Sequence, residues 1–422
     1  MVEKTLGDVA TYINGRAFKP QEWETSGRPI IRIQNLTNST QECNRTTKQF
    51  EEKYRISDGD LLFAWSASLG AHIWHGEDGW LNQHIFKVIP NESIDKIYLY
   101  YYLLYAVDQL YAKTHGSGMV HITLKPFKST RIMLPELNEQ RRVVGKIESL
   151  FAKLDEAKEK AQAVVDSFET RKAAILHKAF TGELTAKWRE ERGVGMESWE
   201  KRRINELARP RAGYAFDSKK FSNTGYQVVR MGNLYGETLD LFRKPVFISE
   251  DDVDDSILNR ALIKDGDILI TLTGTKYKRD YGYAVCVSSP NKLLVNQRIL
   301  CLTPFACVER NYLLYYLKSN LFRDVFFSCE TGGVNQGNVS SKFVENIEIP
   351  IPTFDEQLEI TTVLDRTLAH EQQAKEAAEA VLDQIELMKK SILARAFRGE
   401  LGTNDPSEES AVELLKEIIR RG

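Results

Sequence analysis

Two long stretches of the chain, residues 138–182 and 355–399, carry apolar side chains at heptad-like spacing. Such spacing predicts two α-helices that pack their apolar stripes together as a coiled coil. Each stretch runs for about 43 residues without proline, which corresponds to roughly 65 Å of helix. Asn138 and Asp355 are the expected N-caps, and Gly182 and Gly399 the expected C-caps. The stripe residues are Val144, Ile147, Phe151, Leu154, Val165, Phe168 and Ile175 in the first helix, and Leu364, Leu368, Leu382, Ile385 and Ile392 in the second.

The two helices are long enough to pair with each other. A helix of this length would overhang a domain of ordinary size, so covering that domain alone would leave part of its stripe exposed. An antiparallel pair within one chain buries both stripes and gives a pseudo-twofold arrangement. One globular domain is then expected at each end of the helix pair. The alternative is that each stripe covers only the core of its own domain.

The rest of the chain predicts two globular domains with mixed patterns. Runs such as PIIRIQNL, DLLFAW, IFKVIP, YQVVRM, DILITLTG and RILCLTP are typical of strands, whereas 98–111 and 311–327 are typical of helices. Strands and helices do not alternate regularly, which favours an α+β fold. The expected domains are 1–137 and 198–354, each followed by a long helix, with a connector at 183–197 and a tail at 400–422 that contains a short helix.

An internal repeat explains this organisation. AILHKAFTGEL at 174–184 returns as SILARAFRGEL at 391–401 with seven of eleven residues identical, and MLPELNEQ at 133–140 faces PIPTFDEQ at 350–357. DGDLL, GRAF and Asn82-Gln83 of the first half face DGDIL, GYAF and Asn296-Gln297 of the second, with gaps. The helices are therefore better preserved between the two halves than the globular parts are. This indicates that both helices serve the same attachment while the two globular domains recognise different targets.

Composition narrows the class of protein. The net charge is −2, so a nucleic-acid site must draw on local positive charge. Residues 1–137 contain 15 basic and 15 acidic side chains, and residues 198–354 contain 21 and 18. Five scattered cysteines, the absence of a signal-peptide pattern and the lack of a stretch of about 20 apolar residues favour a reduced, cytoplasmic protein that does not span a membrane.

One loop of the second half is a candidate DNA contact. Its cations and hydroxyl groups suit contacts to phosphates and base edges; they are Thr273, Thr275, Lys276, Lys278 and Arg279. The corresponding loop of the first half offers Ser66, Ser68 and His72 instead. Two domains that share a frame but differ in loop chemistry are expected to read different sequences.

Further polar residues join this interpretation. Asn35 and Asn233 lie at matching positions, as do Asn82-Gln83 and Asn296-Gln297, and these side chains could pair with adenine edges. Arg16, Gln34, Lys219 and Arg298 complete the candidate set. Residues that both halves share are better suited to building the frame than to reading different bases. We therefore favour a structural role for Asn82, Gln83, Asn296 and Gln297.

Motifs for catalysis are missing. The chain has no GxxxxGK[ST], (N/D)PP(Y/F), HExxH or GxSxG segment and no paired-cysteine zinc pattern. The histidines of the first half lack metal-ligand spacing. A nuclease site made of carboxylates and a lysine is too loose a pattern to exclude, so an enzyme stays open as an alternative, beside a duplicated scaffold that binds protein.

The combined pattern resembles the specificity subunit of type I restriction–modification systems. The resemblance covers nearly the whole chain and is carried by LPELNEQRRVV, IPTFDEQLEI, AFTGELTAKWREE and AFRGEL, together with DGDILI and LVNQR. The second copy lacks the TAKWREE segment that follows GEL in the first, so the two docking surfaces are not expected to be identical.

The resemblance implies a non-catalytic subunit that binds double-stranded DNA. Each globular domain would read one half of a bipartite, asymmetric site, and the helices would set the unread gap. Two modification (methyltransferase) subunits would dock on the helices, and restriction (motor–nuclease) subunits would join them. No cofactor is expected in this chain, since S-adenosylmethionine, ATP and Mg²⁺ would belong to the partner subunits.

Overall fold

The computed structural model describes residues 2–37, 41–111, 121–333 and 335–401. These residues fall into two compact units, each built from one globular domain and half of each long helix. The first unit comprises 1–163 and 378–422, and the second comprises 164–377. Residues 402–422, which hold the short helix expected in the tail, lie outside the described residues.

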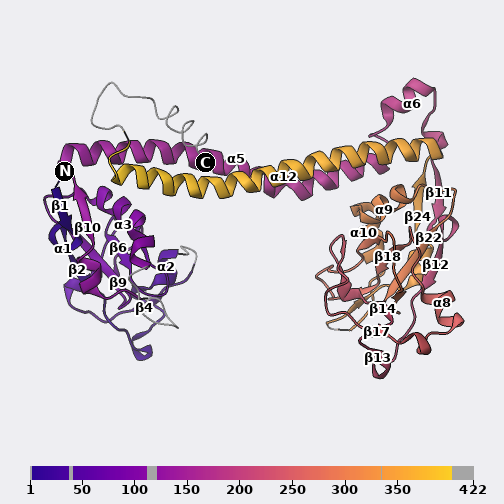
Figure 1. The fold of residues 1–422 in the computed structure, drawn as a ribbon, viewed down its shortest axis with the longest axis horizontal. Helices are drawn as coiled ribbons and strands as arrows, with labels where there is room; N and C mark the ends of the chain where they lie inside the picture. The colour runs from indigo at the N-terminus through magenta and orange to yellow at the C-terminus, as the bar shows by residue number, and fades with distance from the viewer. Residues whose placement is uncertain (1, 38–40, 112–120, 334, 402–422) are drawn as a thin grey trace. The chain divides into compact units, whose positions relative to one another are not determined.

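The globular domain of the first unit is α+β (Figure 1). One four-stranded sheet has the order β2-β9-β6-β7 and a second the order β4-β3-β8-β5, while β1 and β10 pair beside the start of the long helix. The elements are β1 (Val2–Thr5), α1 (Leu6–Val9), β2 (Ala10–Asn14), β3 (Arg28–Ile31), α2 (Ile33–Thr37), β4 (Asn44–Thr46), β5 (Arg55–Ile56), β6 (Leu61–Ala64), β7 (Gly70–Ile73), β8 (Gly79–Leu81), β9 (Ile85–Pro90), α3 (Lys96–Tyr111), α4 (Leu124–Lys128) and β10 (Arg131–Leu134).

The domain of the second unit repeats this plan. Its main sheets have the orders β12-β22-β18-β20 and β13-β17-β14-β21, and β11 pairs with β24. The elements are α6 (Ala186–Arg192), β11 (Glu200–Arg203), α7 (Ile204–Leu207), β12 (Ala208–Ala212), β13 (Phe221–Ser222), β14 (Tyr226–Val229), β15 (Leu234–Tyr235), β16 (Thr238–Leu239), β17 (Phe247–Ile248), α8 (Asp255–Ala261), β18 (Ile268–Thr271), β19 (Thr273–Gly274), β20 (Ala284–Cys286), β21 (Leu293–Val295), β22 (Ile299–Pro304), α9 (Arg310–Lys318), α10 (Asn320–Ser328), β23 (Gly337–Asn338), α11 (Ser341–Glu345) and β24 (Glu348–Ile351).

The repeat is visible in the strand registers. Ala10 of β2 faces Pro90 of β9, and Ala208 of β12 faces Pro304 of β22, in antiparallel pairs. β3 pairs in parallel with β8, as β14 does with β21. The DGD turns before β6 and β18 both place their glycine at positive φ, Gly59 at 80° and Gly266 at 81°, a conformation that glycine adopts without strain. The two domains therefore share one backbone frame.

Two expectations about local structure are wrong. IQNL does not continue the β3 strand but forms the short helix α2, because Asn35 caps this turn from inside. The helix expected over 311–327 is divided into α9 and α10 at Ser319, whose hydroxyl accepts a hydrogen bond from the backbone N–H of Phe322 (3.3 Å) and so starts the second helix.

The long helices are α5 (Leu137–Phe180) and α12 (Phe354–Phe397). Both begin one residue before the expected start, so Asn138 and Asp355 lie in the first turn and are not N-caps. Gly182 and Gly399 follow the C-terminal ends at φ of 83° and 78°, as expected of C-terminal glycines.

Within each unit the two helices run antiparallel. In the first unit, Asp155 pairs with Lys389 and Lys158 with Glu386, so the partner number falls as the α5 number rises. In the second unit, Arg171 pairs with Glu371, and Lys375 lies over the ring of Phe168. Lys158, Lys375 and Lys389, which interrupt the apolar stripes, each contact the other helix. The expected intramolecular coiled coil is confirmed.

The expected stripe residues are buried or half-buried, and none is exposed. The stripes also reach the domain cores: Ile147, Leu150, Ile385 and Ile392 share one apolar cluster with Leu103 of α3. In the second unit Leu176 and Leu364 join the cluster that contains Tyr312 and Leu317 of α9. Each domain therefore packs on the helix pair, and the two packing modes that the sequence left open occur together.

A repeated glutamine fastens each domain to its helix. The side-chain oxygen of Gln140 accepts a hydrogen bond from the backbone N–H of Asp95 (2.8 Å), and its amide group donates to the Pro135 carbonyl (2.9 Å). Gln357 makes the same bonds with Glu309 (2.8 Å) and Pro352 (2.9 Å). Both glutamines are buried, which gives the repeated E-Q dipeptide a physical role in joining helix to domain.

Candidate nucleic-acid interface

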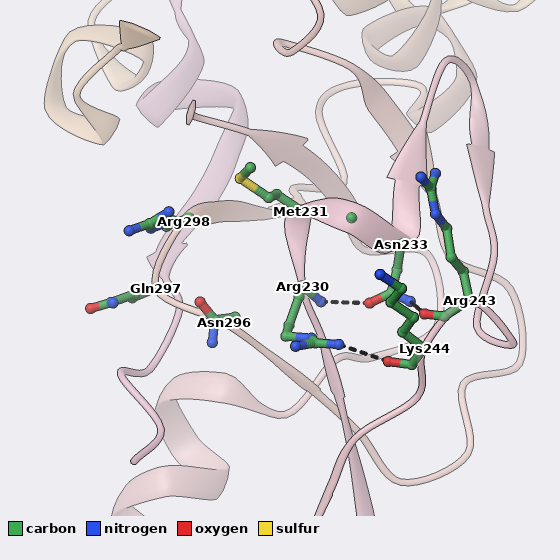
Figure 2. A pocket seen from close by; sticks show the side chains of 9 residues that line it. Arg230, Met231, Asn233, Arg243, Lys244, Asn296, Gln297 and Arg298 are labelled. Carbon is green, nitrogen blue, oxygen red and sulfur yellow. Dashed lines mark hydrogen bonds between the residues drawn. The ribbon is translucent and has the colours of Figure 1, made fainter. Parts of the chain in front are cut away.

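Residues 230–244 of the second unit form a closed loop that is held from within (Figure 2). The buried side chain of Asn233 accepts a hydrogen bond from the backbone N–H of Arg230 (3.0 Å) and donates to the carbonyl groups of Asp240 and Arg243 (both 2.9 Å). The Arg230 guanidinium donates to the Lys244 carbonyl (2.7 Å). These bonds fix the backbone from which the cationic side chains of the loop extend.

Two exposed residues beside this loop, called the ridge below, line two hollows. They are Gln297 and Arg298, in the turn between β21 and β22, and the hollows measure about 460 Å³ and about 420 Å³. Figure 2 shows both side chains extending away from the backbone, and both are exposed. The first hollow is also lined by Arg230, Arg243 and Lys244, and the second by Thr273, Gly332, Gln336 and Asn338.

The ridge is set by its backbone. Asn296 donates its N–H to the Val229 carbonyl (3.0 Å), and Leu272 donates to the Arg298 carbonyl (3.0 Å). The chain at Gly213 approaches so closely that a Cβ there would lie 2.1 Å from the carbonyl oxygen of Asn296. The Gln297 and Arg298 side chains take no part in these bonds and are left to face solvent.

Two further loops border the second hollow. β19 and β23 pair between Thr273 and Asn338, and the Lys276 ammonium donates to the Gly332 carbonyl (3.3 Å). Arg323 donates to the carbonyl groups of Arg279 (2.8 Å) and Gly282 (3.2 Å), which holds the far side of the 275–283 loop. Lys278 is exposed, while Arg279 is exposed beside Asp324 at 3.4 Å.

The described lining of the two hollows carries charge of one sign. Four cationic side chains line the two hollows and Lys276 lies at their edge, while none of the lining residues that the structure describes is acidic. Cations attract phosphate groups, and the amide of Gln297 and the guanidinium of Arg298 have the donor and acceptor geometry that reads base edges in a major groove. The arrangement therefore suits a nucleic-acid duplex.

The first unit builds the corresponding turn with other side chains. The backbone N–H of Asn82 donates to Ile31 (3.1 Å) and that of Trp65 to His84 (3.1 Å), while a Cβ at Gly15 would lie 2.0 Å from the Asn82 carbonyl oxygen. Gln83 contacts His84 through their side-chain nitrogens (3.2 Å), and the His84 ring packs on Trp65. Partial burial, followed by the nearby charge of Arg32, lowers the pKa of His84.

The two predicted asparagines belong to the frame. Asn35 is buried, accepts from the Arg32 N–H (3.0 Å) and donates to the Gln41 carbonyl (3.2 Å), in the same pattern as Asn233. These bonds occupy both ends of each amide, which argues against the predicted contacts of Asn35 and Asn233 with adenine edges.

Other predicted contacts lie away from an open surface. The Arg16 guanidinium is held by Glu22 (2.7 and 3.0 Å) and packs over the rings of Phe18 and Phe50. Ser66 is buried, and the half-buried His72 lines a separate hollow with Tyr100 and Tyr101. Burial lowers the pKa of His72. Ser66 is thus buried and Arg16 and His72 are half-buried, and their DNA contacts stay predictions.

The remaining candidates are distributed unevenly. Ser68 is exposed and Gln34 is half-buried in α2. Lys219 is exposed in a short turn that lines neither hollow of the second unit. Thr273 is buried with its hydroxyl against the Met231 sulfur (3.1 Å), and Thr275 is half-buried in the turn closed by Asp280. Lys276 and Arg298 thus lie at the hollows, and Lys278 and Arg279 extend from the same loop as Lys276.

Sequence reasoning missed three residues of this face and favoured a structural role for a fourth. Arg230, Arg243 and Lys244 line the first hollow, and Gln297 forms the ridge with Arg298. Two features of the sequence could have pointed to these residues. Arg230 lies shortly before the repeated Asn233, and Gln297 belongs to the repeated Asn-Gln pair. Gln297 had been assigned to the frame because it is shared, but only its backbone takes that role.

Within the described ranges, no cluster of three or more His, Cys, Asp or Glu side chains could hold a metal ion. None of the described helices is both long and apolar enough to cross a bilayer.

Comparison with known proteins identifies the family. The model of the type I restriction modification DNA specificity domain matches residues 1–165 and again residues 196–380, which together are most of the chain. The chain belongs to the family of type I restriction–modification specificity subunits. Its two globular domains are accordingly the DNA sequence-recognition domains of a specificity subunit.

Curated relatives extend over nearly the same length. The chain is 23% identical to the type I restriction enzyme EcoBI specificity subunit of Escherichia coli, over 98% of this chain and 90% of the relative. It is 25% identical to the MjaVIII specificity subunit of Methanocaldococcus jannaschii, over 94% and 92%. This specificity subunit therefore matches its relatives across both repeats.

Solved structures share the fold. The HsdS subunit from Thermoanaerobacter tengcongensis superposes with a TM-score of 0.60 at 19% identity, covering 94% of this chain and 97% of that one. A chain of a solved type I R-M system gives a TM-score of 0.68 at 20% identity, covering 94% and 98%. These likenesses confirm two α+β domains with a pair of long helices as the fold of this specificity subunit.

Proposed function

We propose that each globular domain reads one half of a bipartite, asymmetric site in double-stranded DNA, and that the second domain does so with its Gln297–Arg298 ridge. The observation that carries the proposal is that this exposed ridge lines two hollows whose described lining includes cations and no acids. Arginine pairs with guanine and glutamine with adenine through two hydrogen bonds each, so neighbouring side chains of these types can discriminate between bases.

The difference between the two ridges supports a bipartite site. The backbone bonds at Asn82 and Asn296 are alike, but Gln83-His84 stands where the second domain has Gln297-Arg298. His84 adds no full positive charge at neutral pH, since its pKa is lowered by burial and by Arg32. The same frame thus presents a neutral ridge in one domain and a cationic ridge in the other.

The helix pair is proposed to set the unread gap and to dock two modification subunits, which restriction subunits then join. Exposed apolar side chains on α12 support a docking surface; Leu387 is 66% exposed, and Leu358 and Val381 are also open to solvent. The chain itself is proposed to be non-catalytic. S-adenosylmethionine, ATP and Mg²⁺ would act on the partner subunits.

Methylation mapping tests the function as a whole. DNA is taken from cells that express the cognate modification subunit with or without this chain, and methylated adenines are mapped. A two-part motif with a fixed gap, found only with the chain, is the expected result. Absence of the motif despite a demonstrated complex would favour a scaffold, whereas metal-dependent cleavage of DNA by the purified chain would establish an enzyme.

Substitution of the ridge tests the site. Arg298→Ala is expected to weaken binding to the mapped duplex by about 1–3 kcal/mol and to relax the preference at one base pair. Replacement of Lys276, Lys278 and Arg279 together should weaken binding to all duplexes and flatten its salt dependence. Arg209→Ala, which removes an exposed arginine that lines neither hollow, is the matched control. Equal effects of Arg298→Ala and Arg209→Ala would contradict the assignment.

Shortening the helices tests the spacer. Removal of one heptad from α5 and of the seven residues that face it in α12 shortens the pair by about 10 Å. The mapped gap should then decrease by roughly 3 base pairs. A gap of unchanged length in the methylation map would refute the spacer role.

A further inference from the structure

Two aromatic side chains of the second unit are unusually exposed. Phe242 is 94% exposed and Tyr277 is 80% exposed, the two highest values among the large apolar side chains that the structure describes. Each is flanked by cations along the chain, Phe242 by Arg243 and Lys244, and Tyr277 by Lys276 and Lys278. Covering an exposed aromatic ring with another molecule removes apolar surface from water and is therefore favourable.

The Phe242 backbone is held while its ring is free. The N–H of Phe242 donates to the Asp240 carboxylate (2.9 Å), and the next two carbonyl groups accept from Asn233 (2.9 Å) and Arg230 (2.7 Å). Lys244 adopts a positive φ of 48° at the end of this turn. The ring is therefore presented by a fixed loop, so little loop entropy is lost when a ligand covers it.

The Tyr277 loop is built in a comparable way. Thr275 donates its N–H to the Asp280 carboxylate (2.7 Å), and Arg323 holds the Arg279 carbonyl (2.8 Å). Tyr277 itself has a φ of 70°, a conformation that a non-glycine residue adopts at a cost and that is concentrated at functional sites.

Both rings extend from loops that border the ridge. Arg243 and Lys244, which follow Phe242, line the first hollow, and Lys276, which precedes Tyr277, contacts Gly332 in the lining of the second. Gln297 and Arg298 line both hollows and so lie between the two loops. A duplex seated on the ridge by its base edges would therefore meet an aromatic ring on each side.

We propose that Phe242 and Tyr277 stack against the DNA bases at the two borders of the second half-site and open a base step there. This inference rests on the proposed function of the ridge. The flanking cations hold phosphate groups beside each ring. Each ring then faces the interior of the groove, where the bases provide an apolar surface for it to stack on. Apolar side chains that wedge into base steps distort the duplex and add contacts that are insensitive to salt.

In this role, Phe242 and Tyr277 contribute to sequence specificity without forming a hydrogen bond with a base. The cost of opening a base step depends on the sequence of that step, and flexible pyrimidine–purine steps open most readily. The border positions of the second half-site are therefore expected to favour such steps, in addition to the bases read by Gln297 and Arg298.

The experiment uses the full chain and duplexes that carry the motif found by methylation mapping. 2-Aminopurine is placed in turn at each adenine in and next to the second half-site, and its fluorescence reports unstacking. Phe242→Ala and Tyr277→Ala are compared with Phe242→Trp, which keeps a ring, and with Phe305→Ala, an aromatic residue that is 42% exposed and lines neither hollow. Affinity is measured over a range of salt concentrations.

The expected result is a rise in fluorescence at a border position with the unchanged chain, with Phe242→Trp and with Phe305→Ala. Each alanine variant of the proposed wedges should lose that rise at one border and bind about five- to a hundredfold more weakly, with an unchanged salt slope because no charge is removed. Since both rings are exposed, these variants should retain the unfolding temperature of the unchanged chain.

Two results would overturn the wedge role: unchanged affinity of both alanine variants, or a loss of affinity that leaves the fluorescence unchanged. The failure of the proposed function looks different, because the unchanged chain would then fail to retain the motif duplex at all. If Phe242→Ala and Tyr277→Ala instead weakened capture of the modification subunit while DNA binding was intact, the rings would belong to a protein interface and the proposal would be wrong.

Discussion

Replacement of Glu356 by alanine should destabilise the second unit more than any surface change to the long helices. The Glu356 side chain, in the first turn of α12, is fully buried. Its carboxylate pairs with the Arg189 guanidinium and accepts hydrogen bonds from the Thr185 hydroxyl (2.7 Å) and the Trp199 indole N–H (3.0 Å). These partners come from the segment that follows α5, so one carboxylate fastens that segment to the start of α12.

The magnitude follows from what remains after the substitution. Arg189 is 9% exposed and keeps its contacts with Thr185 and the Gly182 carbonyl, but its charge loses the compensating carboxylate. Removing one member of a buried ion pair costs about 3–5 kcal/mol. Arg189→Ala should cost a similar amount, because it leaves the buried carboxylate of Glu356 without its cation.

The double variant separates this mechanism from simple loss of contacts. With both charges removed, no uncompensated charge is left, so Arg189→Ala/Glu356→Ala should cost about as much as either single change rather than their sum. Asp355→Ala is the matched control in the same helical turn, and since Asp355 is exposed it should cost less than about 1 kcal/mol.

Hydrogen exchange in the full chain is the assay, since it reports each segment separately in a protein of two units. Backbone amides of 185–199 and 354–360 should lose protection together in both single variants, while amides of the first unit keep theirs. Additive costs in the double variant, or a cost below about 1 kcal/mol for Glu356→Ala, would refute the reasoning.

Three further predictions concern the frame. Gly213→Ala should destabilise the second domain by about 1–3 kcal/mol and weaken duplex binding, because its Cβ would lie 2.1 Å from the Asn296 carbonyl oxygen. Gly232→Ala, whose Cβ would meet no atom within 4 Å, is the stability control and should leave the denaturation midpoint unchanged. Glu237→Gln should lower the urea midpoint at pH 7 by weakening the contacts with Lys172 and Lys318. Burial alone would raise the pKa of Glu237, but the two ammonium groups lower it, so this stabilisation is present above the ordinary pKa and is lost as pH falls through the lowered pKa. A difference in midpoint between the two chains that does not shrink in acid would contradict this. The hydrogen bonds of Glu22 with Arg16 lower the pKa of Glu22 to about 2. An NMR titration should therefore find Glu22 ionised throughout the range in which an ordinary glutamate protonates. An ordinary pKa would show that Arg16 does not pair with Glu22.

The sequence was sufficient to predict the long helices and the duplicated domains. Heptad spacing located the stripe from Val144 to Ile175, and strand-like runs such as IFKVIP and RILCLTP coincide with β9 and β22. Propensity failed where a side chain redirects the backbone locally: Asn35 turns IQNL into a helix, and Ser319 divides α9 from α10. Both effects depend on single hydrogen bonds that periodicity does not report.

The site was predicted less completely for a different reason. Lys276 and Arg298 were named because they are charged residues in loops, and they lie at the hollows. Asn35 and Asn233 were named because polar residues match between the halves, and Arg16 from its residue type. Whether an amide or guanidinium faces solvent depends on distant partners such as Asp240 and Glu22, which the sequence does not bring together. The same holds for Arg189 and Glu356, whose motifs are separated by more than 150 residues in the sequence and meet only in the folded unit.

The repeated backbone bonds explain how two recognition domains can diverge without losing their fold. The bonds at Asn35 and Asn233 and the close approaches at Gly15 and Gly213 fix the loop and the ridge through side chains that are buried or absent. The exposed residues of the second ridge, Gln297 and Arg298, contribute only backbone groups to that frame, so replacing them leaves its buried hydrogen bonds intact. Replacement of the exposed Arg298 by another polar residue should therefore change stability by less than about 0.5 kcal/mol, as surface substitutions usually do. Specificity can change at these positions because stability is determined elsewhere.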